Sequence, residues 1–210
     1  MNSVTPNARS RRTREALLVA GRQLLEEGGF DALTMAATAE RAEVSRRGIY
    51  LHFSSRAELV TAIHDHIAEQ QGRAESLSRV WKQTDPVAAL REWAAHLARY
   101  HVQVLAVDRA VRTARFGDPD VAAYRAQVAQ NQRGACRRLI QGLADHELLA
   151  ATWTVDTGTD MLWSLLSTDM IEALVLECDW SRETLSRRLQ EVYCSVFVNR
   201  DTPNDHPHIE

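Results

Sequence analysis

The sequence has few of the residues that interrupt helices or cross-link chains. Its 210 residues include only 5 prolines, 9 glycines and 3 cysteines. The scarcity of chain breakers, together with the lack of convincing alternation of polar and apolar residues, favours an all-helical fold over one containing strands. Cys136, Cys178 and Cys194 are far apart and have no CxxC spacing. This pattern argues against a disulfide framework or a zinc site, and predicts reduced thiols.

Long apolar runs are also lacking. No window approaches the roughly 18 consecutive apolar residues that span a bilayer. The first residues, MNSVTPNARSRRTRE, have no apolar core like that of a signal peptide. We therefore expect a cytoplasmic protein that does not contact a membrane. The apolar fraction of 45% and the charged fraction of 25% are typical of a globular protein and exclude wholesale disorder.

Lysine is nearly absent, and the charges are unevenly distributed. Lys82 is the only lysine, so the basic residues are nearly all arginines. Residues 1–60 carry 9 basic and 7 acidic side chains, a net charge of +2, and the rest of the chain carries 16 basic and 21 acidic side chains, a net charge of -5. The basic residues cluster at Arg9, Arg11, Arg12 and Arg14, and again at Arg46 and Arg47. Such clusters on an acidic protein indicate a localised anion-binding surface.

Apolar residues recur at helical spacing and predict about nine helices. Their approximate ranges are 13–27, 34–42, 45–52, 55–72, 86–106, 108–116, 119–144, 156–177 and 181–198. Thr34, Ser45 and Ser55 stand where N-caps are expected. Only Glu43 and Val44 separate the second helix from the third. Two short, tightly joined helices with basic residues at the start of the second are typical of a helix-turn-helix, whose second helix enters the DNA major groove.

The stretch TMAATAERAEVSRRGIYLHFSSRAEL, from Thr34 to Leu59, closely resembles the signature of the TetR family of transcriptional regulators. The matching residues are Thr34, Ala39, Ala42, Val44, Ser45, Tyr50, His52, Phe53, Ser55 and Leu59. The resemblance implies an all-α protein, with a three-helix DNA-binding domain and a larger helical bundle for ligand binding and dimerisation. We expect a flexible basic arm at 1–10, the helix-turn-helix domain at 11–56, the bundle at 57–198 and a disordered tail at 199–210.

Two positions depart from the family pattern. The family usually has a large aliphatic residue where Thr38 stands, and a glycine where Glu43 stands in the turn. If Glu43 takes the positive φ that this turn tends to require, the cost is on the order of 1 kcal/mol relative to glycine. We therefore expect local strain at Glu43.

By similarity to the family, the first domain holds the residues that contact double-stranded DNA. Arg46, Arg47 and Gly48 are expected at base edges, where arginine is well suited to reading guanine. Phosphate contacts are expected from Thr34, Tyr50, His52, Ser55 and Arg56, partly through the free N–H groups at helix starts. Ser45 is also expected among the DNA-binding residues.

The second domain is expected to bind a small, largely apolar effector and a second copy of the chain. The candidate effector-binding residues are large or polar side chains on otherwise interior stripes, and a cavity lined by such residues suits a small ligand. They are Trp93, His96, Tyr100, Arg112, Phe116, Tyr124, Gln127, Asn131, Trp163 and Asp169. The candidate dimer contacts are Leu162, Leu166, Met170, Leu185, Leu189, Val192 and Val196. Core and interface are not separable from the pattern alone.

No metal, cofactor or catalytic site is predicted. His64 and His66 diverge on a helix, and His206 and His208 lack a third ligand. No phosphate loop, GxSxG, HExxH or Cys/His nucleophile pattern occurs. The expected function is a ligand-responsive repressor that binds a palindromic operator as a homodimer, with His64, Asp65 and His66 transmitting the response. The alternatives are an activator or accessory regulator of the same type and, more remotely, a helical-bundle enzyme or small-molecule carrier.

Overall fold

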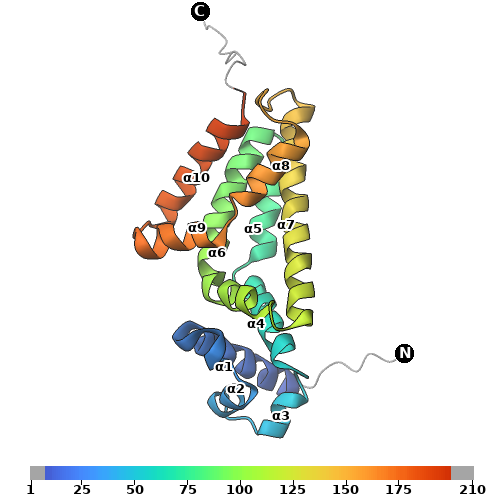
Figure 1. Ribbon diagram of the computed structural model, residues 1–210, viewed down its shortest axis with the longest axis vertical. Coiled ribbons are helices and arrows are strands. Elements are labelled where there is room, and N and C mark those ends of the chain that lie inside the picture. Colours follow the sequence, from blue (N-terminus) through green and yellow to red (C-terminus); the bar gives the residue numbers. More distant parts are fainter. Residues whose placement is uncertain (1–7, 200–210) are drawn as a thin grey trace, which may run out of the picture. The chain divides into compact units, whose positions relative to one another are not determined.

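The computed structural model describes residues 8–199, and these residues are overwhelmingly helical (Figure 1). Within this range the only β pairing is an isolated bridge between Leu149 and Val198. The predicted all-α class is confirmed. The elements are α1 Ala8–Ala32, α2 Met35–Arg41, α3 Arg46–Tyr50, α4 Arg56–Gln70, α5 Arg73–Trp81, α6 Pro86–Ala114, α7 Pro119–Asp145, α8 Val155–Ser164, α9 Thr168–Glu172, the π-helical segment η1 Ala173–Glu177, and α10 Arg182–Phe197.

The chain divides into two compact units. The first contains residues up to Arg73 together with Gln103–Ala129, and the second contains Ala74–Val102 together with the chain from Gln130 onward. Helix α4 therefore groups with α1, α2 and α3. The domain boundary that we predicted after residue 56 concerns which part of the chain folds and functions as a separate domain, and it stays a prediction.

The structure corrects several predicted helix bounds. Helix α1 begins at Ala8, so residues 8–10, expected in the flexible arm, are helical, whereas residues 1–7 and 200–210 lie outside the described part of the chain. Helix α5 was not predicted, because its short segment buries little more than Ser76 and Val80. The predicted helices 86–106 and 108–116 form one helix, with Val107 buried in it.

The predicted helix 156–177 is interrupted. Helix α8 ends at Ser164, and α9 begins after Ser167, whose φ of -54° and ψ of 120° are not helical. The last turns, Ala173–Glu177, are π-helical. Leu162 on α8 and Ile171 on α9 are both buried. Apolar residues therefore recur on both sides of the break, and for this reason the sequence pattern did not reveal it.

The first unit has a continuous core between α1 and α4. The predicted stripe of Leu59, Ile63 and Ile67 on α4 is fully buried, as expected. Gly21 on α1 lets the two helices approach closely, since a Cβ atom there would lie 2.6 Å from Ile63 Cδ1. The close packing of α1 against α4 thus forms the rigid part of the unit, to which α2 and α3 are attached.

In the second unit, the end of α10 is hydrogen-bonded to the loop before α8. Trp153 Nε1 donates a hydrogen bond to the Val196 carbonyl at 2.8 Å, and the Ala150 N–H donates to the Phe197 carbonyl at 2.9 Å. Tyr193 and Phe197 are fully buried. These contacts fix the orientation of α10, which carries several of the predicted dimer residues. Across residues 8–199, none of the helices combines the length and apolarity that a membrane crossing requires.

The turn between α2 and α3 confirms the strain expected at Glu43, whose φ is 55°. We expect Glu43→Gly to raise the free energy of unfolding by about 1 kcal/mol, because glycine adopts this conformation without a Cβ penalty. That gain corresponds to a rise in melting temperature of about 2 to 4 °C. Glu40→Gly, in the regular part of α2, is the matched control, since glycine inside a helix costs about 1 kcal/mol. A lower melting temperature for Glu43→Gly would contradict the assignment of strain.

Candidate nucleic-acid interface

The three predicted N-caps are confirmed, and they define the starts of α2, α3 and α4. Thr34 Oγ1 accepts from the Ala37 N–H at 3.0 Å, and Ser45 Oγ accepts from the Gly48 N–H at 3.0 Å. Ser55 Oγ accepts a hydrogen bond at 3.1 Å from the backbone of α4. Each cap satisfies one of the N–H groups left open at a helix start, while the remaining ones stay available to an anion.

The start of α3 presents two unpaired cations. Arg46 and Arg47 are exposed, and neither has an ion-pair partner among residues 8–199. They are the side chains that the sequence assigns to base reading, and they are free to extend. Gly48 also has a packing role: a Cβ atom there would lie 2.7 Å from Val44 Cγ1 and 3.1 Å from Ser45 Oγ. Gly48 therefore lets α3 pack closely on the turn.

The end of α3 alternates between buried and exposed side chains. Ile49 and Phe53 are buried at 0% and 1% exposure, whereas Tyr50 is 57% exposed and Leu51 is 79% exposed. His52 is half-buried, with its ring centroid 6.4 Å from that of Phe53. Sequence reasoning placed Tyr50 and His52 at the interface and missed Leu51, although a large apolar residue between those two positions was the available signal.

Arg56 is held by contacts inside the first unit. Its guanidinium carbon lies 3.5 Å from the centre of the Phe30 ring, and Nη2 donates to the Phe30 carbonyl. Burial lowers the pKa of Arg56, partly offset by the nearby Asp31 carboxylate. In this geometry Arg56 joins the start of α4 to the end of α1, a contact between chain-distant residues that the pattern did not indicate. Its role as a phosphate ligand stays a prediction.

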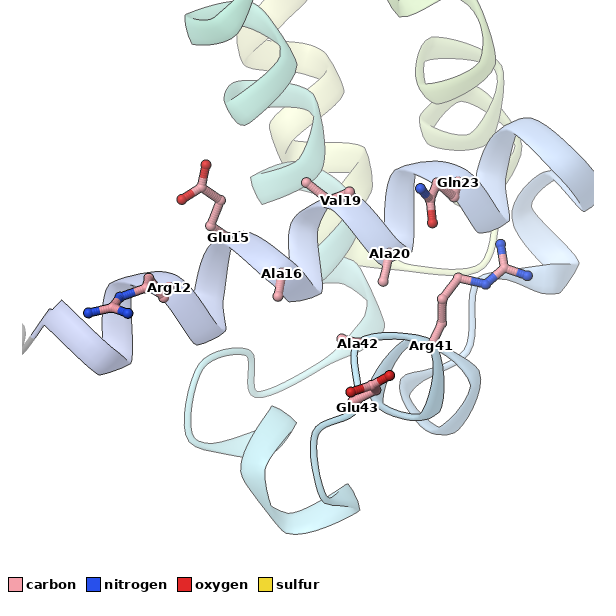
Figure 2. Close-up of a pocket in the computed structure, with 9 residues that line it drawn as sticks. All are labelled: Arg12, Glu15, Ala16, Val19, Ala20, Gln23, Arg41, Ala42 and Glu43. Carbon is pink, nitrogen blue, oxygen red and sulfur yellow. The ribbon is translucent and has the colours of Figure 1, made fainter.

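A groove lies beside the turn, between α1 and the end of α2. Figure 2 shows its lining residues, with Arg12 and Glu15 on α1 across from Glu43 in the turn. The volume is about 470 Å³, and small side chains such as Ala16 form part of the lining. Arg41, which also lines the groove, forms an ion pair with Glu27 at 2.7 Å. The groove thus exposes charges of both signs, in contrast to the two unpaired arginines on α3.

Comparison with known proteins identifies this region. Residues 17–63, which include the capped α2, the turn and α3, match the family described as bacterial regulatory proteins, tetR family. Over residues 17–63 the chain is similar to the TetR family.

Two curated relatives match part of the chain. They are the HTH-type transcriptional regulator TtgR and the probable HTH-type transcriptional regulator ArpR, both from Pseudomonas putida. Each is 32% identical over 80 residues, and the match covers 38% of this chain and 38% of the relative. The match therefore spans little more than a third of either relative's length.

Solved structures share the fold across both units. A putative regulator from Saccharomonospora viridis in complex with choline has a TM-score of 0.72 at 14% identity, covering 89% of this chain and 98% of that one. NalD, described as the secondary repressor of the MexAB-OprM multidrug efflux pump in Pseudomonas aeruginosa, has a TM-score of 0.69 at 19% identity, covering 92% and 100%. At these identities the likeness establishes the fold alone.

The predicted effector residues fall in different places in the structure. Trp93, His96 and Tyr100 are buried in the second unit. The interior position predicted for Phe116 is wrong, because α6 ends at Ala114 and Phe116 lies in the following turn with 82% exposure. Gln127, Asn131 and Asp169 are exposed, and Arg112, Tyr124 and Trp163 are half-buried.

Trp93, His96 and Tyr100, the three buried residues, belong to a row of aromatic rings. Trp81, which sequence reasoning missed together with α5, lies 6.3 Å from Trp93, and Trp93 lies 5.3 Å from His96. His96 stacks on Tyr100, with ring centroids 5.8 Å apart and an interplanar angle of 4°. We call these four residues the aromatic row.

The predicted dimer residues divide by burial. Leu162, Leu166, Leu185 and Leu189 are at most 5% exposed within one chain, so they belong to the core of the second unit. Val192 on α10 is 42% exposed, and Met170 and Val196 are half-buried. The exposed and half-buried residues are the ones available to a second copy. Within the described range, no three His, Cys, Asp or Glu side chains converge in a way that would hold a metal ion.

Proposed function

We propose that the chain is a ligand-responsive transcriptional repressor that binds a palindromic operator as a homodimer. The observation that carries this proposal is the helix-turn-helix that matches the TetR family, with Arg46 and Arg47 exposed at the start of α3 and without an ion-pair partner in the described residues 8–199. Arginine forms bidentate hydrogen bonds with guanine O6 and N7 in the major groove. Thr34 and the exposed Tyr50 flank this base-reading element and are suited to phosphate contacts that set its register.

Dimerisation follows from the small size of the reading element. The five residues of α3 contact too few base pairs for useful specificity, so two copies about 34 Å apart on a palindrome are required. Val192 offers an exposed apolar residue on α10 for this contact. Leu189 and Tyr193, buried on the same helix, supply the rigid support that a well-packed interface needs.

The aromatic row is the proposed effector contact. Ser76 Oγ lies 2.9 Å from His96 Nδ1 and accepts from Arg99 Nε at 2.9 Å, which fixes the His96 ring from one side. Trp93 Nε1 is buried and has no hydrogen-bond partner in the described part of the chain. An apolar ligand that stacks on these rings and carries a hydrogen-bond acceptor would satisfy this donor. The effector is therefore largely apolar with at least one acceptor atom.

The response is proposed to pass along α7 to α4. Within the first unit, Tyr124 Oη donates to Asp65 Oδ1 at 3.0 Å and lies 2.6 Å from His64 Nδ1. Since tyrosine has a single proton, both hydrogen bonds form when His64 donates from Nδ1. The pKa of Asp65 is lowered by its interaction with His64 and by the Tyr124 hydrogen bond. Residues 119–129 of α7 belong to the first unit, and the remainder of the helix belongs to the second. Helix α7 therefore connects the second unit, which contains the aromatic row, to the unit that contains α4.

Tyr124→Phe tests this route. The substitution removes two hydrogen bonds worth about 1 kcal/mol each and leaves the ring in place. We expect a ligand that releases wild-type protein from DNA to be needed at roughly tenfold higher concentration, with DNA affinity in the absence of ligand changed less than about threefold. The measurement is fluorescence anisotropy of labelled DNA during ligand titration. An unchanged release midpoint would remove Tyr124 from the route.

The repressor proposal is tested first on DNA. Full-length protein is mixed with the DNA that flanks its own gene, in a mobility-shift assay at two salt concentrations with random DNA as competitor. We expect retention that survives the competitor and weakens steeply with salt, because bound phosphates release counterions. Compounds are then screened for release, with choline and flat apolar aromatics as the first probes. Failure to enrich any sequence from a random duplex library would overturn the DNA-binding function.

An activator remains the second candidate. The same contacts with DNA serve either output, because the position of the operator relative to the promoter decides the sign. A reporter fused to the neighbouring promoter, measured with and without the gene, distinguishes the two. The curated relatives are named as transcriptional regulators, which favours this class over a helical-bundle enzyme or carrier.

A further inference from the structure

Leu51 is an apolar side chain in an unusual position. It is 79% exposed at the end of α3, whereas Ile49 and Phe53 on either side are buried in the first unit. Its φ of -77° and ψ of -15° are helical, so the geometry of α3 continues through it. Leu51 follows Arg47 by four residues and therefore lies on the same face of the helix, about 6 Å further along the axis.

A leucine so placed has nothing to gain from water or from a phosphate. It has no hydrogen-bonding group, and its exposure leaves apolar surface in water until a partner covers it. In the major groove the one apolar group on a base edge is the C5 methyl of thymine. A leucine one helical turn beyond a guanine-reading arginine is within reach of that methyl group.

We propose that Leu51 contacts the C5 methyl of a thymine in each half-site and thereby selects thymine near the guanine read by Arg47. The inference rests on the proposed function, in which α3 enters the major groove. Tyr50 lies beside Leu51 and is 57% exposed. When α3 lies in the major groove, Tyr50 contacts the sugar-phosphate backbone and does not replace the contact of Leu51 with thymine. Specificity at this base pair thus comes from apolar contact alone.

The test removes the methyl group and the leucine separately. A random duplex library is selected with full-length wild-type protein, and each thymine of the enriched sequence is then replaced by deoxyuridine, which lacks only the C5 methyl. For wild type we expect a loss of about fourfold in affinity at one thymine per half-site, the effect of one buried methyl group. Leu51→Ala is expected to bind the thymine duplex at least about fourfold more weakly and to bind both duplexes equally.

Val19→Ala is the matched control, since Val19 is an exposed aliphatic residue on α1, 41% exposed. It should keep the wild-type preference for thymine over deoxyuridine. The thermal unfolding of Leu51→Ala should match wild type, because the side chain makes few contacts within the chain. A Leu51→Ala variant that retains the wild-type preference would overturn the inference while leaving the proposed function intact.

Two other outcomes also decide the matter. If Leu51→Ala changes the oligomeric state of the free protein and not the thymine preference, a second copy covers Leu51 and the inference is overturned. If wild type enriches no sequence at all, the proposed function fails and the inference fails with it. The thymine preference of wild type and its loss in Leu51→Ala are together the supporting result.

Discussion

Arg47→Ala is expected to weaken binding to the specific operator by about 5- to 150-fold per half-site, because a bidentate arginine contact with guanine provides roughly 1 to 3 kcal/mol of discrimination. On random DNA the loss should be much smaller and reflect only the removed charge. Arg47 is exposed and has no ion-pair partner in the part of the chain that the structure describes, so its removal leaves no buried partner there unsatisfied. The fold should therefore be unaffected, and thermal unfolding checks this.

The measurement for Arg47 is the ratio of affinities for the selected duplex and for random DNA. Arg47→Lys keeps the charge and loses the bidentate geometry, so it should lose specificity while retaining affinity for random DNA. Arg91→Ala, an exposed arginine on α6 in the second unit, is the matched control and should bind as wild type does. Equal losses on specific and random DNA would show that Arg47 contacts a phosphate and reads no base.

Val192→Glu is expected to convert the proposed dimer into a monomer. Val192 is 42% exposed on α10, and in a symmetric interface a glutamate there would face an apolar surface or its own copy. Such a charge costs several kcal/mol, which corresponds to roughly 10²-fold weaker association. Sedimentation equilibrium over a range of concentrations measures the change, and circular dichroism should show unchanged helix content.

Leu189→Ala separates core from interface. Leu189 is 4% exposed within one chain, so its truncation should lower the free energy of unfolding by about 2 to 5 kcal/mol. The dimer should persist under conditions where the variant is folded. A Val192→Glu protein that remains a dimer would place the interface elsewhere on the second unit, and operator binding would then be retained as well.

Local sequence rules predicted the elements of the DNA-binding domain well. A cap joins a side chain to a backbone N–H three residues later, so Thr34, Ser45 and Ser55 were recognisable without any tertiary information. The strain at Glu43 was predicted from the resemblance, since the family usually has a glycine at this position of the turn, and Glu43 does have a positive φ of 55°. The resemblance to the TetR family assigned these capped helices and the turn between them to one helix-turn-helix.

Patterns of longer range were less informative. The break between α8 and α9 and the exposure of Phe116 escaped prediction, since apolar periodicity shows which residues are alike and does not show where a helix ends. Similarly, all seven predicted dimer residues are apolar. Burial within one chain distinguishes Leu189 from Val192, and burial depends on the neighbouring helices.

The sequence by itself determined the helical class, the capped helix-turn-helix and the pair of arginines at the start of α3, because these depend on interactions between residues a few positions apart. The tertiary structure decided what each remaining side chain contacts. Arg56 stacks on Phe30, 26 residues earlier, and Tyr124 bonds to Asp65, 59 residues earlier. Such pairs form only when distant segments pack together, so their partners are fixed by the arrangement of helices and not by the local pattern of the chain.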